Sequence, residues 1–62
     1  MKYKIVIRSN EFKAEYLLLR EYYFNNKLHR EDGPAIEWED DYKEWWIKDK
    51  YFTEAEFNAL KA

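Results

Sequence analysis

Apolar and polar residues alternate from Tyr3 to Tyr16, which is the period of a strand with one buried face. A turn at Ser9-Asn10 would pair apolar with apolar residues on one face. On the other face the same turn would set Arg8 opposite Glu11. We therefore predict an antiparallel hairpin at the start of the chain.

A helix is the alternative for residues 11–24, because their apolar residues also fit a helical stripe. The stripe consists of Phe12, Tyr16, Leu19 and Tyr23. We favour the hairpin, since it also explains the charge pairs.

A second hairpin is predicted around Asn25-Asn26, because Asn tolerates the positive φ of a type I′ turn. This turn would set Tyr23 opposite Leu28. The charged pairs that follow from it are Glu21 with Arg30 and Arg20 with Glu31.

A third hairpin is predicted from 35–39 and 42–48, with Asp40-Asp41 as its turn. It would place Ile36 and Trp38 on one face with Trp45. The predicted outer face consists of Ala35, Glu37, Glu39, Tyr42, Glu44 and Trp46. In this register Glu37 lies opposite Glu44, a like-charge pair that should weaken the sheet.

A helix is predicted after Thr53, because Thr53 and Glu56 have the spacing of a capping box. Phe52 and Phe57 flank the cap at the staple positions, and Leu60 continues the apolar side that should dock on the sheet. The fold class is α+β and mostly β: a five-stranded antiparallel meander with a short C-terminal helix. The single domain, 1–62, comprises an N-terminal hairpin (1–24), further hairpins (20–51) and a capping helix (53–61).

The segment Lys27-Leu-His-Arg-Glu-Asp-Gly-Pro-Ala35 resembles the MORN-type repeat variant of bacteria and bacteriophages. The resemblance extends over residues 20–51 and implies short hairpin units, with a degenerate second unit after Trp45. Such units usually occur in tandem and bury each other's faces. A single unit implies that the first hairpin and the final helix cap it. Gly33 and Pro34 mark the sharpest break in the chain.

Composition narrows the class of protein. A chain of 62 residues has a small core, and its 21% aromatic residues should supply most of it. The chain has no cysteine, and its early apolar run, 5–7, is too short for a membrane span. We expect a protein of the bacterial cytoplasm that does not enter a membrane.

Catalysis is not expected from this sequence. His29, Arg30 and Asp32 could form an acid–base group, but Ser9 and Thr53 already serve in a turn and a cap. One His, no Cys and one Gly predict neither a metal site nor a phosphate loop. We therefore predict no catalytic, metal or cofactor residues, and expect His29 to hydrogen-bond within the sheet or a turn.

Charge is uneven along the chain. Residues 1–30 hold seven Lys and Arg against three Glu, whereas residues 31–62 hold four Lys against ten Asp and Glu. The basic residues of the first hairpin are Lys2, Lys4, Arg8 and Lys13. Because Glu11 and Glu15 lie between them, direct nucleic-acid binding is only a secondary hypothesis.

The acidic segment is the predicted partner-binding surface. Its residues are Glu37, Glu39, Asp40, Asp41, Tyr42, Glu44 and Trp46. Aromatic residues anchor interfaces, and an acidic field steers a basic partner. Together with the phage-like resemblance, this pattern predicts a non-enzymatic inhibitor of a host defence complex, of the anti-CRISPR kind, that occludes a basic nucleic-acid-binding surface. The alternative interpretation of this segment is structural: the acidic residues form a solvated rim, and Trp46 covers the C-terminal helix.

An antitoxin-like or self-associating repeat module is the alternative, acting through apolar and sheet-edge surfaces. A homodimer through an aromatic sheet face would use the surface assigned to the partner.

Overall fold

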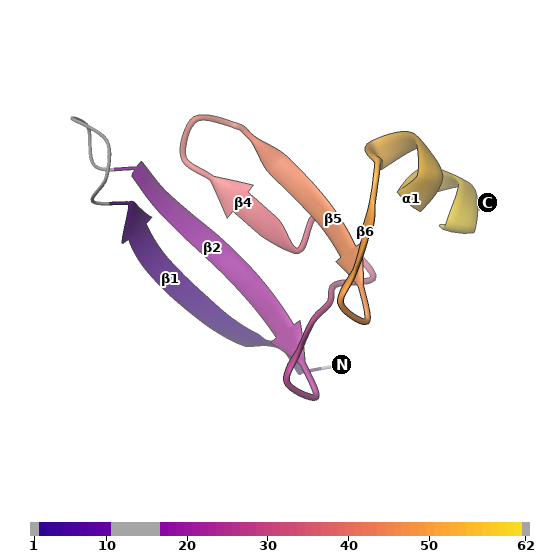
Figure 1. Ribbon diagram of the computed structural model, residues 1–62, viewed down its shortest axis with the longest axis horizontal. Helices are drawn as coiled ribbons and strands as arrows, with labels where there is room; N and C mark the ends of the chain where they lie inside the picture. The colour runs from indigo at the N-terminus through magenta and orange to yellow at the C-terminus, as the bar shows by residue number, and fades with distance from the viewer. Residues whose placement is uncertain (1, 11–16, 62) are drawn as a thin grey trace.

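The computed structural model describes residues 2–10 and 17–61, which form one antiparallel sheet with a helix at its far end (Figure 1). The sheet runs in the order β1-β2-β4-β5-β6. The short strand β3 pairs with the same edge of β2 as β4 does. The described part is flat and elongated, 39 × 24 × 15 Å. The elements are β1 (Lys4–Asn10), β2 (Leu17–Phe24), β3 (Lys27–Leu28), β4 (Ile36–Trp38), β5 (Lys43–Ile47), β6 (Lys50–Phe52) and α1 (Glu54–Lys61).

The mostly antiparallel β fold with a C-terminal helix is confirmed, but residues 2–10 and 17–61 contain six strands where five were predicted. The sixth is β6, which pairs with β5 through Trp46 and Tyr51. No helix in the described part of the chain combines the length and the apolar character that a membrane crossing requires.

β1 pairs with β2 in a different register from the prediction. Ser9 lies opposite Leu18 inside the strand pair, so the turn is not at Ser9-Asn10. Arg8 consequently lies opposite Leu19 and not opposite Glu11. The predicted strand at 11–16 falls outside the described residues. Residues 17–24 are a strand, which excludes the helical alternative for that part.

The turn between β2 and β3 is confirmed. Asn25 and Asn26 have φ of 52° and 62°, and Tyr23 lies opposite Leu28. The predicted continuation is wrong, because β3 ends at Leu28 and β4 takes its place beside β2. The observed pairs are Arg20 with Glu37 and Glu21 with Ile36, in place of Arg20 with Glu31 and Glu21 with Arg30.

β4 and β5 are joined by the three-residue loop 39–41, not by a two-residue turn. The Trp38 N–H donates to the Tyr42 carbonyl at 2.9 Å, and Asp41 has a φ of 69°. This is the geometry of a type I turn closed by a left-handed residue. The extra loop residue shifts the register by one, which moves side chains to the other face.

Two faces of the sheet follow from the observed pairs, because opposed residues of antiparallel strands point to the same side. The Tyr22 face carries Ile5, Ile7, Leu18, Arg20, Tyr22 and Glu37. The Glu44 face carries Val6, Arg8, Leu19, Glu21, Ile36, Trp38 and Glu44, with Trp46 two residues further along β5.

The predicted clash between Glu37 and Glu44 is therefore absent from the fold. Glu37 lies opposite Lys43, and Glu44 lies opposite Ile36. The predicted outer face is wrong as well, because its member Ala35 is completely buried. The shifted register accounts for both differences.

The core gathers on the Tyr22 face. Of the described hydrophobic residues, Tyr22, Ala35 and Phe57 are buried. The Arg30 guanidinium lies 4.0 Å from the centre of the Tyr22 ring, in cation–π geometry. A Cβ on Gly33 would meet Arg30 Cζ at 3.1 Å, so Gly33 makes room for Arg30. The φ of Gly33 is not positive, so space for Arg30 and not a left-handed backbone accounts for glycine here.

α1 begins with the predicted capping box. The Glu56 N–H donates to Thr53 Oγ1 at 3.1 Å, and the Thr53 N–H donates to Glu56 Oε1 at 3.0 Å. The helix lies beside β5 and β6, where the Phe57 and Trp45 ring centres are 6.5 Å apart. Leu60 is exposed, so the helix docks through Phe57.

Candidate functional site: the acidic tip

The loop between β4 and β5 ends in an acidic tip, which we define as Glu39, Asp40, Asp41, Tyr42 and Glu44. Its first four residues are exposed, and Glu44 is half-buried at the start of β5. Among residues 2–10 and 17–61, the four carboxylates of the tip make no ion pair. The tip thus presents uncompensated negative charge to solvent.

Internal hydrogen bonds hold two of these carboxylates in place. Asp40 Oδ1 accepts from the Tyr42 N–H at 3.2 Å, and Glu44 Oε1 accepts from Trp46 Nε1 at 2.9 Å. The Asp40 carboxylate has a second oxygen for an external donor. The Glu44 carboxylate, through a hydrogen bond with the phenol and through its charge, raises the pKa of Tyr42. Tyr42 therefore stays a neutral donor beside the acids.

A hollow of about 350 Å³ lies beside the Asp40, Tyr42 and Glu44 side chains of the tip. It is lined by Trp38, Asp40, Tyr42 and Glu44. Two aromatic side chains and two carboxylates around one space suit a cationic side chain, which is attracted both by ring faces and by negative charge.

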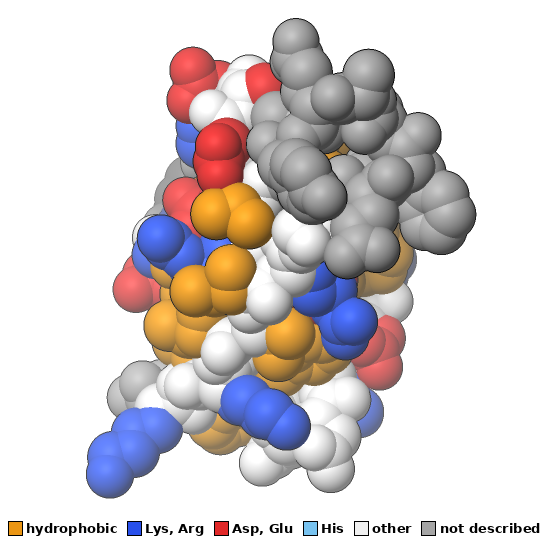
Figure 2. All heavy atoms as spheres, turned by 90° about the vertical axis from the view of Figure 1, so that its left-hand side faces the viewer, with side chains coloured by type: hydrophobic (Ala, Val, Ile, Leu, Met, Phe, Trp, Pro, Cys, Tyr) orange, Lys and Arg blue, Asp and Glu red, His pale blue; other side chains and the backbone are white. Residues whose placement is uncertain are grey.

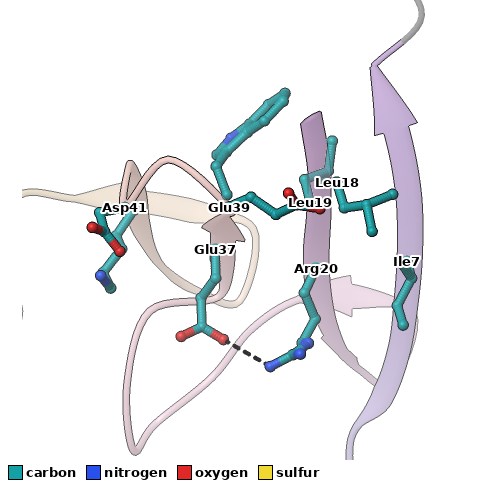
Figure 3. A pocket seen from close by; sticks show the side chains of 9 residues that line it. Ile7, Leu18, Leu19, Arg20, Glu37, Glu39 and Asp41 are labelled. Carbon is teal, nitrogen blue, oxygen red and sulfur yellow. Dashed lines mark ion pairs between the residues drawn. The ribbon is translucent and has the colours of Figure 1, made fainter. Parts of the chain in front are cut away.

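A second hollow, of about 410 Å³, lies between the tip and the β1–β2 pair (Figure 3). Figure 3 shows the Glu37 carboxylate directed toward the Arg20 guanidinium, with Oε1 and Nη1 3.7 Å apart. The same oxygen lies 3.3 Å from Arg30 Nη1. Glu37 is therefore neutralised by two arginines. The remaining lining residues are Ile7, Leu18, Leu19, Trp38, Glu39, Asp41 and Lys43.

The structure thus divides the predicted partner-binding residues into groups. The smaller hollow, of about 350 Å³, is lined by Asp40, Tyr42 and Glu44. The larger hollow, of about 410 Å³, is lined by Glu37, Glu39 and Asp41. Trp46 is half-buried, with its indole N–H bonded to Glu44 and its ring 5.6 Å from the Tyr51 ring. Glu37 differs from the acidic tip because two arginines neutralise it, and Trp46 supports Glu44.

Sequence reasoning missed two residues of these hollows. It placed Trp38 on an inner face, whereas Trp38 lines both hollows, and it paired Arg20 with Glu31, whereas Arg20 faces Glu37. The signal that could have found Trp38 is the Asp-Asp pair after Glu39, which also suits a three-residue loop.

His29 has the structural role that was expected. It is buried, and its Nδ1 accepts from the Lys48 N–H at 3.0 Å. Its Nε2 lies 3.4 Å from Glu31 Oε1, and its ring centre lies 5.8 Å from that of Phe24. In the described residues, no group of three or more His, Asp or Glu side chains is arranged to hold a metal ion.

The basic surface of the first hairpin is partly neutralised. Arg8 Nε lies 2.6 Å from Glu21 Oε1, which raises the pKa of Arg8 through the hydrogen bond and the charge of Glu21. Lys2 and Lys4 are exposed, and Lys13 falls outside the described residues. Nucleic-acid binding by this hairpin stays a hypothesis that rests on few free cations.

Comparison of the chain with protein-family models, with curated proteins and with solved structures gave no match. The resemblance of residues 27–35 to the MORN-type repeat stays a prediction from those residues.

Proposed function

We propose that this protein is a non-enzymatic binding module whose acidic tip docks on a basic surface of a larger protein. The observation that carries the proposal is the set of four carboxylates without ion-pair partners among the described residues, two of which, Asp40 and Glu44, line a hollow with Trp38 and Tyr42. An acidic field of this kind steers the encounter, and the aromatic rings supply the anchor.

The proposed consequence of docking is occlusion. Protein grooves that bind phosphate are basic, so a carboxylate-rich tip competes for the same cations as a nucleic acid. Asp40 and Glu44 are already oriented by internal hydrogen bonds, which lowers the cost of ordering them on binding. The sharpest form of the proposal is an inhibitor of a nucleic-acid-binding defence complex, similar in action to an anti-CRISPR protein.

Charge reversal in the tip tests this proposal. Immobilised wild-type protein is compared with Glu39→Lys and Asp41→Lys in capture from a nuclease-treated bacterial lysate at low salt. Neither side chain makes a hydrogen bond or an ion pair among the described residues, so both variants should fold. The matched control is Glu54→Lys, the same change of charge at an exposed position of α1.

The expected result is a protein that wild type and Glu54→Lys retain and the tip variants lose. The retained protein should bind a labelled duplex DNA or RNA, and wild type should displace that probe. Retention should fall steeply with added salt, because the interaction is between exposed charges. Equal retention by all four proteins would remove the acidic tip as the binding surface.

A further inference from the structure

β1 is a seven-residue strand at the edge of the sheet. One side of β1 pairs with β2 from Lys4 to Asn10, and no described strand pairs with its other side. An edge strand of this length carries a row of unpaired N–H and C=O groups, which can pair with another strand. Figure 1 places this edge at the opposite end of the sheet from α1.

Apolar side chains lie beside the open edge. Ile5, Ile7 and Leu18 are 52%, 65% and 45% exposed, and all three belong to the Tyr22 face. Figure 2, which faces this side of the molecule, shows hydrophobic side chains with Lys and Arg side chains between them. Proteins usually protect edge strands with charges, proline or bulges. On the Tyr22 face, β1 has none of these devices, since its residues there are Ile5, Ile7 and Ser9.

We infer that β1 pairs with β1 of a second copy of this chain, antiparallel and with Ile7 on the two-fold axis. Directly opposed residues of an antiparallel pair point to the same face, so a residue cannot lie opposite its own sequence neighbour in the other copy. The two-fold axis must therefore pass between the two copies of one residue. With the axis at Ile7, Ile5 lies opposite Ser9, Val6 opposite Arg8, and Lys4 opposite Asn10. No two charges of the same sign are then directly opposed.

The neighbouring registers are unfavourable by charge. An axis at Val6 would set Lys4 opposite Arg8 twice, and an axis at Arg8 would oppose the two Arg8 side chains. Like charges directly opposite each other weaken a strand pair. With the axis at Ile7, each Arg8 also brings its own neutralising carboxylate, Glu21 Oε1 at 2.6 Å. Arg8 thus adds little uncompensated charge to the interface, and the two Lys4 residues lie at its ends, opposite Asn10.

The expected dimer is weak. Its contacts are one strand pair and the flanks of Ile5 and Ile7, which is less than the 1,200 Å² or so of a standard interface. A dissociation constant of roughly micromolar size fits such an area. Mass action then makes the unfolding temperature rise with protein concentration.

Single cysteines test the register, because the natural chain has none. Opposed Cα atoms of an antiparallel pair are about 4.5–5.5 Å apart, within disulfide range. Ile7→Cys should therefore cross-link to a covalent dimer under mild oxidation. In Val6→Cys the two cysteines are diagonal neighbours about 7–8 Å apart, and in Ile5→Cys they are about 13 Å apart along the strand. Both should cross-link at least about tenfold less than Ile7→Cys.

The second measurement is the monomer–dimer equilibrium of the wild type and of variants without cysteine, followed by sedimentation over a range of protein concentrations. Wild type should pass from monomer to dimer, and Ile7→Lys should weaken the dimer by about tenfold or more, because two ammonium groups would meet on the axis. Leu60→Lys, an equally exposed apolar position on α1, is the matched control and should dimerise like wild type. Asp41→Lys should also dimerise normally, which separates this interface from the acidic tip.

Two outcomes would overturn the inference. A wild-type protein that stays monomeric up to about millimolar concentration would leave the β1 edge to a strand of a different protein. Preferential cross-linking of Val6→Cys or Ile5→Cys would show that copies meet in another register or through another surface.

Discussion

The backbone N–H of Lys48 donates a hydrogen bond to Nδ1 of the buried His29 at 3.0 Å. This bond joins the residue after β3 to the β5–β6 turn, which is far from it in the sequence. Beside it, the Leu28 N–H donates to Asp49 Oδ1 at 2.8 Å, and the Asp49 N–H donates to the Leu28 carbonyl at 3.0 Å. The last residue of β3 and His29 after it are therefore fastened to the β5–β6 turn by three hydrogen bonds.

Replacing His29 by Ala should destabilise the protein by about 2–4 kcal/mol, because it removes a buried ring and leaves the Lys48 N–H without its acceptor. Urea unfolding followed by tryptophan fluorescence measures the change. The matched control is Glu31→Gln, which removes the negative charge of the exposed partner of Nε2 and should cost less than about 0.5 kcal/mol. Similar losses for both variants would contradict the role of Nδ1.

Arg30 holds the loop before β4 against the sheet. Its Nε donates to Asp32 Oδ1 at 3.0 Å, and its Nη1 donates to the Pro34 carbonyl at 3.1 Å and to Glu37 Oε1 at 3.3 Å. The guanidinium plane also covers Tyr22. A lysine at this position would keep the charge and lose the fork of donors and the stacking.

We expect Arg30→Lys to lower the free energy of unfolding by about 1–2 kcal/mol. Arg8→Lys is the control, since Arg8 is more than half exposed and its pair with Glu21 should contribute little to stability. Urea unfolding of both variants at the same pH provides the comparison. A larger loss for Arg8→Lys would contradict the structural role given to the guanidinium of Arg30.

Gly33→Ala probes the same contact from the other side. The new Cβ would lie 3.1 Å from Arg30 Cζ, and Arg30 is held too firmly to move without losing a hydrogen bond. We expect a loss of about 1 kcal/mol, measured by thermal unfolding. If Gly33→Ala is made in the Arg30→Lys background, the loss should shrink, because the crowded guanidinium is gone.

Local chemistry was predictable from the sequence, and long-range register was not. The turn at Asn25-Asn26 and the cap at Thr53 depend on residues within four positions, so their residue types determine them. The mostly β fold also follows from the alternation of apolar and polar residues. The turn predicted at Ser9-Asn10 failed because those residue types are also tolerated inside a strand pair.

The candidate site was predictable only as a stretch of acidic residues. A loop of two or three residues suits Glu39 to Asp41 equally well by type, and the choice decides whether Glu37 shares a face with Glu44. The neutralisation of Glu37 by Arg20 and Arg30 depends on that register, so sequence spacing did not reveal it.

The capping box makes stability depend on pH. The Thr53 backbone N–H and hydroxyl both stabilise the charged Glu56 carboxylate, so they lower its pKa from the ordinary value of 4.5. A lowered folded-state pKa contributes stability above the unfolded value, and this contribution is lost as pH falls through the folded-state pKa. The Arg30 hydrogen bond lowers the pKa of Asp32 from 3.8, with the same sign.

Glu56→Gln should therefore lose the part of the acid dependence that belongs to Glu56. Its difference from wild type, measured by urea unfolding from pH 7 to pH 2.5, should be largest above pH 4.5 and should narrow toward acid. Thr53→Ala should cost about 1 kcal/mol at neutral pH through loss of the cap. A difference that grows toward acid would have the wrong sign for this mechanism.

Asp41 and Asp49 both have left-handed backbone, with φ of 69° and 67°, yet glycine should affect them in opposite directions. At Asp41 no hydrogen bond of the side chain is found among the described residues, so Asp41→Gly should relieve the strain of a Cβ and stabilise the protein by about 0.5–1 kcal/mol. At Asp49 the side chain accepts from the Leu28 N–H, so Asp49→Gly should destabilise the protein by about 1 kcal/mol, because the lost bond outweighs the relief.

The same pair of variants separates stability from binding. Asp41→Gly removes a carboxylate from the acidic tip while strengthening the loop, so partner capture should fall although thermal stability rises. Asp49→Gly lies outside the tip and should retain the partner despite its lower stability. If capture instead follows the unfolding temperature in both variants, the tip acts through the stability of the fold, and its charge is not what the partner recognises.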